Sequence, residues 1–125
     1  MFRTLQIALF CFCFAAVAMA HHSTTAVYNA DEPSIMLEGT VTQVEWRNPH
    51  IWFYIDVVGD DGTVTNWGVE FQTPPLRMLR RGWTQESLQV GDVITVEGAP
   101  PRNRELIRVL SQTTTLPDGR ELGGR

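Results

Sequence analysis

The stretch that decides the fold runs from residue 50 to residue 71 and reads HIWFYIDVVGDDGTVTNWGVEF. Apolar residues occupy every second position in its first part, where Ile51, Phe53 and Ile55 fall on one face. A period of two is typical of a half-buried β-strand. The GDDG at residues 59–62 is a hairpin turn signal, because glycine reaches positive φ at little cost. The segment therefore predicts two antiparallel strands.

Upstream, the same period runs through IMLEGTVTQVEW, residues 35–46. Its apolar positions change register after Val41, because the next ones are Val44 and Trp46. A phase slip of this kind predicts a bulge or a bend within one long strand.

Downstream, TPPLRMLRRG at residues 73–82 leaves the strand pattern. Its two prolines suit a first helical turn and Gly82 suits a helix end. Thr73 is expected to cap the helix. Leu76 and Leu79 are three positions apart and so share a helix face. These features predict one short helix.

Two more strands are predicted, over residues 93–98 and 105–115, and a final turn offers a short extra pairing. The order is therefore three strands, a helix and two strands. Together with the bent first strand, it predicts an all-β fold, a small five-stranded OB-type barrel with one short helix between strands 3 and 4. A small β-sandwich is the alternative.

The first twenty residues differ in composition from the rest of the chain. They contain one basic residue and an apolar run, and they end in Ala-Met-Ala. This is the pattern of a secretory signal peptide cleaved after Ala20. The predicted organisation is a signal peptide over residues 1–20, an N-terminal arm over 21–34 that is at most partly ordered, and the barrel domain over 35–125. We expect export to the periplasm or beyond it in a Gram-negative-type bacterium, with no stable membrane anchor after cleavage.

The charge balance bears on partners. Ten basic residues, all arginine, stand against fourteen acidic ones, and the formal net charge is −4. A negative surface disfavours nucleic acid, whose binding depends on neutralising phosphates, and it disfavours anionic membranes. We therefore expect a small ligand or a metal ion as the partner, with an unidentified protein as a further option, and no nucleic acid.

Several separated motifs resemble a family of small exported bacterial proteins that is classified as a domain of unknown function. The resemblance rests on an AHHS mature start, a W-x-N-P-H strand motif that ends at His50, and the stretches VTNWGVE, LRRGWTQESLQVGDVITVEGAP and LPDGREL. It covers nearly the whole predicted mature chain. It implies an exported bacterial protein and supplies no activity.

The three histidines suggest a metal site. Cleavage after Ala20 makes His21 the first residue, so that an α-amine with a pKa of about 7.7–8.0 joins its imidazole. His50 heads the second strand, where the arm can reach it, and His22 is a spare donor. This set resembles the histidine brace of copper proteins, and its nitrogen donors favour Cu(II). The alternative is a soluble arm, with His50 bonded to turn backbone.

Trp52 and Tyr54 alternate with the core positions and form a candidate ligand-binding face, since OB-type barrels bind oligonucleotides or sugars on such faces. Core packing is the alternative. The carboxylates Glu45, Asp56 and Glu70 show no acid–base spacing, and no nucleophile motif is present. We therefore expect a non-enzymatic binding protein for copper or, through the aromatic face, for a glycan, peptide or protein. A copper oxidoreductase is the least favoured class.

Overall fold

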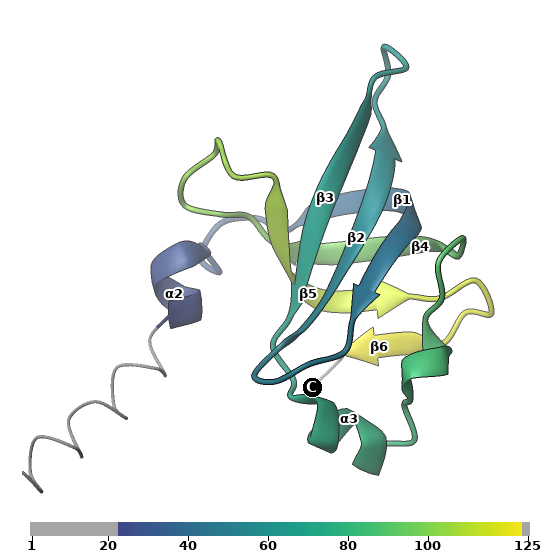
Figure 1. Ribbon diagram of the computed structural model, residues 1–125. Coiled ribbons are helices and arrows are strands. Elements are labelled where there is room, and N and C mark those ends of the chain that lie inside the picture. Colours follow the sequence, from purple (N-terminus) through teal and green to yellow (C-terminus); the bar gives the residue numbers. More distant parts are fainter. Residues whose placement is uncertain (1–22, 124–125) are drawn as a thin grey trace, which may run out of the picture.

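The computed structural model describes residues 23–123. In chain order the elements are α2 (Ser23–Val27), β1 (Ile35–Glu45), β2 (Ile51–Val58), β3 (Val64–Phe71), α3 (Pro75–Arg80), the 3-10 turn η2 (Gln85–Ser87), β4 (Val93–Ala99), β5 (Arg108–Thr115) and β6 (Glu121–Gly123). The strands form one sheet in the order β3-β2-β1-β4-β5-β6 (Figure 1). A parallel pairing of β3 with β5 closes the sheet into a barrel. The expected OB-type barrel, with its helix between β3 and β4, is confirmed.

β1 connects the two halves of the barrel. Its residues 35–40 pair with β4, and residues 40–45 pair with β2. The pairing with β2 shifts register between Val41 and Gln43, which confirms the bulge predicted from the phase slip. Gly39 lies just before the bulge, where a Cβ would stand 2.7 Å from a backbone carbonyl oxygen of β2. Only glycine lets the two strands approach so closely.

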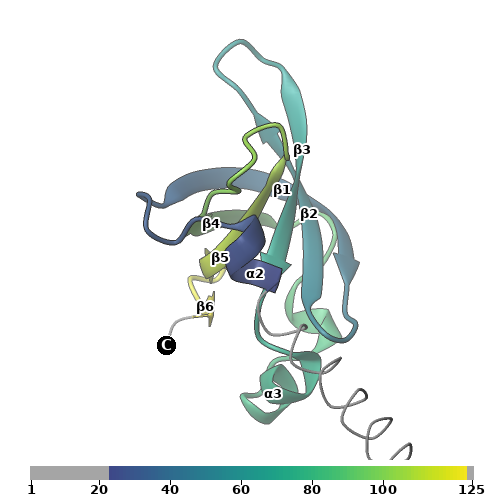
Figure 2. The same ribbon diagram turned by 90° about the vertical axis from the view of Figure 1, so that its left-hand side faces the viewer.

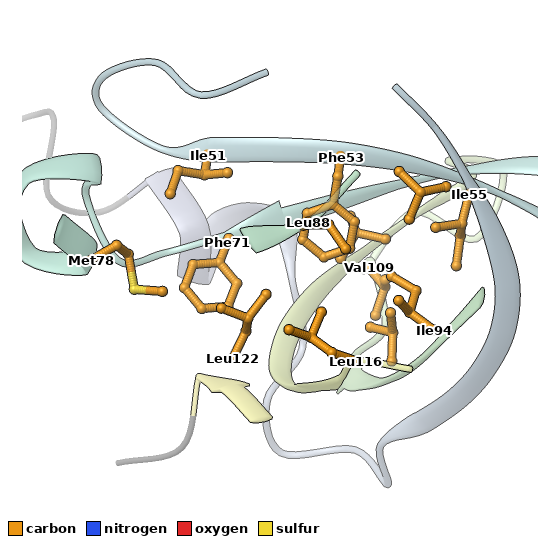
Figure 3. Packing of buried hydrophobic residues seen from close by; sticks show 13 residues of the cluster. Ile51, Phe53, Ile55, Phe71, Met78, Leu88, Ile94, Val109, Leu116 and Leu122 are labelled. Carbon is orange, nitrogen blue, oxygen red and sulfur yellow. The ribbon is translucent and has the colours of Figure 1, made fainter. Parts of the chain in front are cut away.

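The core fills the inside of the barrel, as Figure 3 shows. Alternate residues of β2 are buried while those between them are half-exposed, so the period of two marks the core face as expected. The core cluster contains Val41, Ile51, Phe53, Ile55, Val69, Phe71, Met78, Leu88, Ile94, Val96, Val109, Leu116 and Leu122. Trp46, Trp67 and Trp83 pack against it and are partly buried.

The helix α3 closes one end of the barrel. The expectation that Thr73 caps it is wrong, because the N-cap position is held by Pro74 and no side-chain cap hydrogen bond forms. Met78 enters the core and is 1% exposed. Leu76 and Leu79 share a face as predicted, but that face is exposed to solvent.

The N-terminal segment is more ordered than the expected arm. Residues 23–27 form α2, and Tyr28 is 2% exposed and bridges to Pro101. Figure 2 shows α2 in front of β5. No helix among residues 23–123 is long and apolar enough to cross a membrane. The predicted signal peptide, His21 and His22 lie outside the described residues.

Candidate functional site

The outward face of β2 and β3 carries the polar and aromatic residues predicted for it. His50 precedes β2, and Trp52 and Tyr54 alternate with the buried positions of that strand. In the β2–β3 hairpin Trp52 lies opposite Glu70. The alternation on the two strands therefore brings an imidazole, two aromatic rings and a carboxylate to one face.

A buried carboxylate holds His50. The Nδ1 atom of His50 lies 2.5 Å from Oε1 of Glu70, and Glu70 is only 8% exposed. An ionised carboxylate can only accept hydrogen bonds, so Nδ1 is the donor. With Nδ1 as the donor, Nε2 is the ring nitrogen that carries the lone pair whenever the imidazole is neutral. The His50 side chain remains 21% exposed.

Tyr28 binds the second oxygen of the same carboxylate. Its hydroxyl donates to Oε2 of Glu70 at 2.7 Å. Burial, and after it the hydrogen bond and charge of Glu70, raise the pKa of Tyr28 well above its ordinary value of 10.0, while Arg108 acts in the opposite direction. Tyr28 is therefore a permanent donor near neutral pH. The two hydrogen bonds join Tyr28, Glu70 and His50 into what we call the Tyr28–Glu70–His50 network.

The segment around Tyr28 is anchored at several points. Arg102 donates from Nε to the backbone carbonyl of Thr25 at 2.9 Å. Gln72 donates from Nε2 to Oγ1 of Thr24 at 3.2 Å. Ile51 and Phe71 form the last pair of the β2–β3 register at this end, and His50 and Gln72 are the residues just beyond it. The start of α2 therefore contacts the end of the hairpin at which His50 lies.

Trp52 and Tyr54 form a stacked pair beside the network. Their ring centroids are 6.5 Å apart and the rings are inclined by 23°. Both rings lean over Gly68, since a Cβ there would lie 3.4 Å from Trp52 and 3.5 Å from Tyr54. Trp52 and Tyr54 are half-buried. Their faces supply the aromatic surface that the sequence predicted.

The three carboxylates weighed from the sequence do not gather. Glu45 and Glu70 flank Trp52 from opposite sides, and Asp56 accepts a hydrogen bond from Asn66. Within residues 23–123 no three His, Cys, Asp or Glu side chains come together as a metal site.

The sequence reasoning missed Glu70 as the partner of His50 and Tyr28 as the partner of Glu70. The signal for Glu70 was present, because the GDDG turn sets a register in which Glu70 and Trp52 face each other. Tyr28 is 42 positions from Glu70, and no local pattern connects residues so far apart.

The sequence matches the model of a family of unknown function, DUF6152, over residues 9–108. No curated protein matches the sequence of this chain. Solved structures do match. The mitochondrial single-stranded DNA-binding protein of S. cerevisiae has a TM-score of 0.50 at 12% identity, over 67% of this chain and 92% of that one.

Two further structures match at a TM-score of 0.49. They are the N-terminal domain of the PriB protein of Thermoanaerobacter tencongensis, at 20% identity over 67% of this chain and 94% of that one, and the Stn1–Ten1 complex of S. pombe, at 17% identity over 68% and 58%. The likeness to the mitochondrial protein shows the fold alone.

These matches correct the expectation about partners. Excluding nucleic acid on the ground of net charge is wrong, because a protein with this fold binds single-stranded DNA. The physical reason is that net charge averages over the surface, whereas binding depends on the charge of one local face.

Proposed function

We propose that this chain, which belongs to the family of unknown function DUF6152, is an exported, non-enzymatic binding protein for copper. In this proposal the signal peptide is cleaved after Ala20 and the protein works in the periplasm or outside the cell. His50 and the new N-terminal His21 hold the metal, and His22 is an additional donor.

The observation that carries the proposal is the pairing of His50 with Glu70. Metal-binding histidines commonly donate their second ring nitrogen to a carboxylate, which orients the ring and makes the free nitrogen a better ligand. His50 Nδ1 lies 2.5 Å from Glu70, and Tyr28 holds the same carboxylate in place. Nε2 is then the atom available to a metal ion.

The chain length supports the partnership with His21. Three peptide units separate His21 from Thr24, so their Cα atoms are at most about 11 Å apart. Thr24 contacts Gln72, which follows the Ile51–Phe71 pair that His50 precedes. In this proposal the first residue of the processed chain is close enough along the chain to reach His50. Its α-amine and imidazole would complete a set of nitrogen donors that Cu(II) prefers among divalent first-row ions.

Copper titration of the exported protein tests this proposal. The protein is recovered from the exported fraction, its intact mass records the cleavage site, and electron spin resonance with Cu(II) reports the ligand atoms. We expect nitrogen coupling that is lost in His50→Ala. Three alanines added ahead of His21 keep both imidazoles, remove the amine from that residue and leave neither His21 nor His22 at the third position, and they should weaken binding strongly.

Glu45→Gln is the matched control for Glu70→Gln, because Glu45 and Glu70 flank the same tryptophan on opposite strands. We expect Glu70→Gln to weaken copper binding about 10–100-fold and Glu45→Gln to leave it unchanged. Copper binding that survives His50→Ala with unchanged spectra would refute the proposal.

A second candidate function rests on the stacked pair Trp52 and Tyr54. Aromatic faces on OB-type sheets bind ligands by stacking, and a glycan, a peptide or a partner protein fits this chemistry. Replacing both residues by alanine should then abolish retention on an array of immobilised glycans and peptides while copper binding remains. Retention that is equal for the double variant and the wild type would rule out this face.

A further inference from the structure

The outward side of α3 exposes apolar side chains that are not part of the core. Pro75 and Met78 are the buried residues of this helix. Leu76 and Leu79, on the other side, are 60% and 49% exposed. Helix geometry places these leucines beside one another, since residues three apart share a face.

Three arginines are neighbours of these leucines in the chain. Arg77 and Arg80 lie within α3, Arg81 follows it, and all three are exposed. Among residues 23–123 none of them makes an ion pair or a hydrogen bond with a carboxylate. We call Leu76, Arg77, Leu79, Arg80 and Arg81 the α3 surface.

The other arginines of residues 23–123 all have partners. These pairs are Arg47 with Glu45, Arg102 with the carbonyl of Thr25, Arg104 with Glu32, Arg108 with Tyr28, and Arg120 with Asp118 and the Trp83 ring. Among residues 23–123 the arginines without a side-chain partner are therefore concentrated on α3 and the residue that follows it, in a chain whose net charge is negative.

A groove adjoins the α3 surface. Leu76 and Leu79 form part of its wall, and Trp46, the residue after β1, forms another part. Tryptophan is favoured where an apolar phase meets water, because its ring is apolar and its N–H is polar. Glu86 is the acidic residue of the lining, and the hydroxyl of Thr84 lowers its pKa.

We propose that the α3 surface docks on a phospholipid bilayer that contains anionic headgroups. Arginines at such a surface attract the negative lipids, and leucines beside them enter the boundary between headgroups and acyl chains. A purely phosphate-binding face would use the arginines but would have no use for the leucines. The negative charge elsewhere on the protein opposes this weakly, since charges more than about 8–10 Å away are screened in physiological salt.

Sedimentation with lipid vesicles tests the proposal. The exported protein is mixed with vesicles of phosphatidylcholine alone, or of equal parts phosphatidylcholine and phosphatidylglycerol. We expect binding to the anionic vesicles and little to the neutral ones. Each arginine near the surface contributes about fivefold to partitioning, so R77Q/R80Q/R81Q should lower it on the order of 100-fold.

Variants of the leucines distinguish docking on a bilayer from binding of a soluble anion. L76S/L79S should also lower vesicle binding at least about tenfold, because the apolar contact is lost. V58S/V64S is the matched control, since both valines are exposed, at 66% and 56%, and lie at the β2–β3 hairpin away from α3. We expect it to bind as the wild type does.

Three outcomes would overturn the proposal. They are an absence of binding to anionic vesicles, vesicle binding that R77Q/R80Q/R81Q does not reduce, and vesicle binding that L76S/L79S does not reduce. Thermal melting of each variant checks that it is folded. The single variants Leu76→Ser and Leu79→Ser replace L76S/L79S if that protein does not fold, and each should still lower vesicle binding.

Discussion

Removing the hydroxyl of Tyr28 tests the Tyr28–Glu70–His50 network directly. Tyr28→Phe keeps the ring in its buried place, where the residue is 2% exposed. It removes the donor that lies 2.7 Å from Oε2 of Glu70. The carboxylate then stays buried with His50 as its remaining side-chain partner among the described residues.

The expected cost follows from the nature of this bond. A hydrogen bond to a charged group contributes about 1.5–3 kcal/mol to stability, and a neutral one about 1 kcal/mol. We therefore expect Tyr28→Phe to lower the free energy of unfolding by about 2 kcal/mol. In a Glu70→Gln background the same change should cost only about 1 kcal/mol, because the acceptor is then neutral.

Urea unfolding of the metal-free protein, followed by tryptophan fluorescence, measures these values. Tyr54→Phe is the matched control, because no hydrogen bond of the Tyr54 hydroxyl occurs within residues 23–123. We expect this control to change stability by less than about 0.5 kcal/mol. Equal effects of Tyr28→Phe and Tyr54→Phe would show that the buried hydroxyl does not support Glu70, and the reasoning would fail.

Three further predictions concern the titration of Tyr28 and the packing of the barrel. The raised pKa of Tyr28 gives stability that is fully present below the ordinary tyrosine value of 10.0 and is lost above it. Above that pH the free energy of unfolding in urea should therefore fall by up to about 1.4 kcal/mol per pH unit more in the wild type than in Tyr28→Phe. Gly98→Ala should cost about 2 kcal/mol or more in urea unfolding, because its Cβ would lie 2.4 Å from the carbonyl oxygen of Leu110. Gly59→Ala, whose nearest atom belongs to a movable side chain, should cost less. Ile55→Ala should lower the free energy of unfolding by about 2–5 kcal/mol in the same assay, since Ile55 is 0% exposed; a loss below about 1 kcal/mol would contradict its place in the core.

Much of the barrel is readable from local patterns. The alternation in β2 predicted which of its side chains are buried, the GDDG stretch predicted the hairpin, and the phase slip after Val41 predicted the bulge in β1. These features depend on neighbours a few residues apart. Backbone geometry relates such neighbours in the same way in every strand, turn or helix, so their order along the chain is enough.

The candidate site was readable only in part. Placing His50, Trp52 and Tyr54 on the outward face needs nothing beyond the period of two. The helix α3 shows the limit of such patterns. The spacing of Leu76 and Leu79 predicted that they share a face, but it could not predict whether that face contacts the core or solvent. Only the packing of α3 on the barrel end decided that Met78 is buried.

By itself, then, the sequence determined the strands, their turns, the faces they present and the position of the helix, because each of these follows from short-range periodicity. Tertiary structure decided the parallel closure of β3 on β5 and the meeting of Tyr28 with Glu70 and His50. These contacts join segments far apart in the chain. Their formation depends on how the whole barrel curves and closes. The sequence around each of these residues does not indicate which distant residue it will contact.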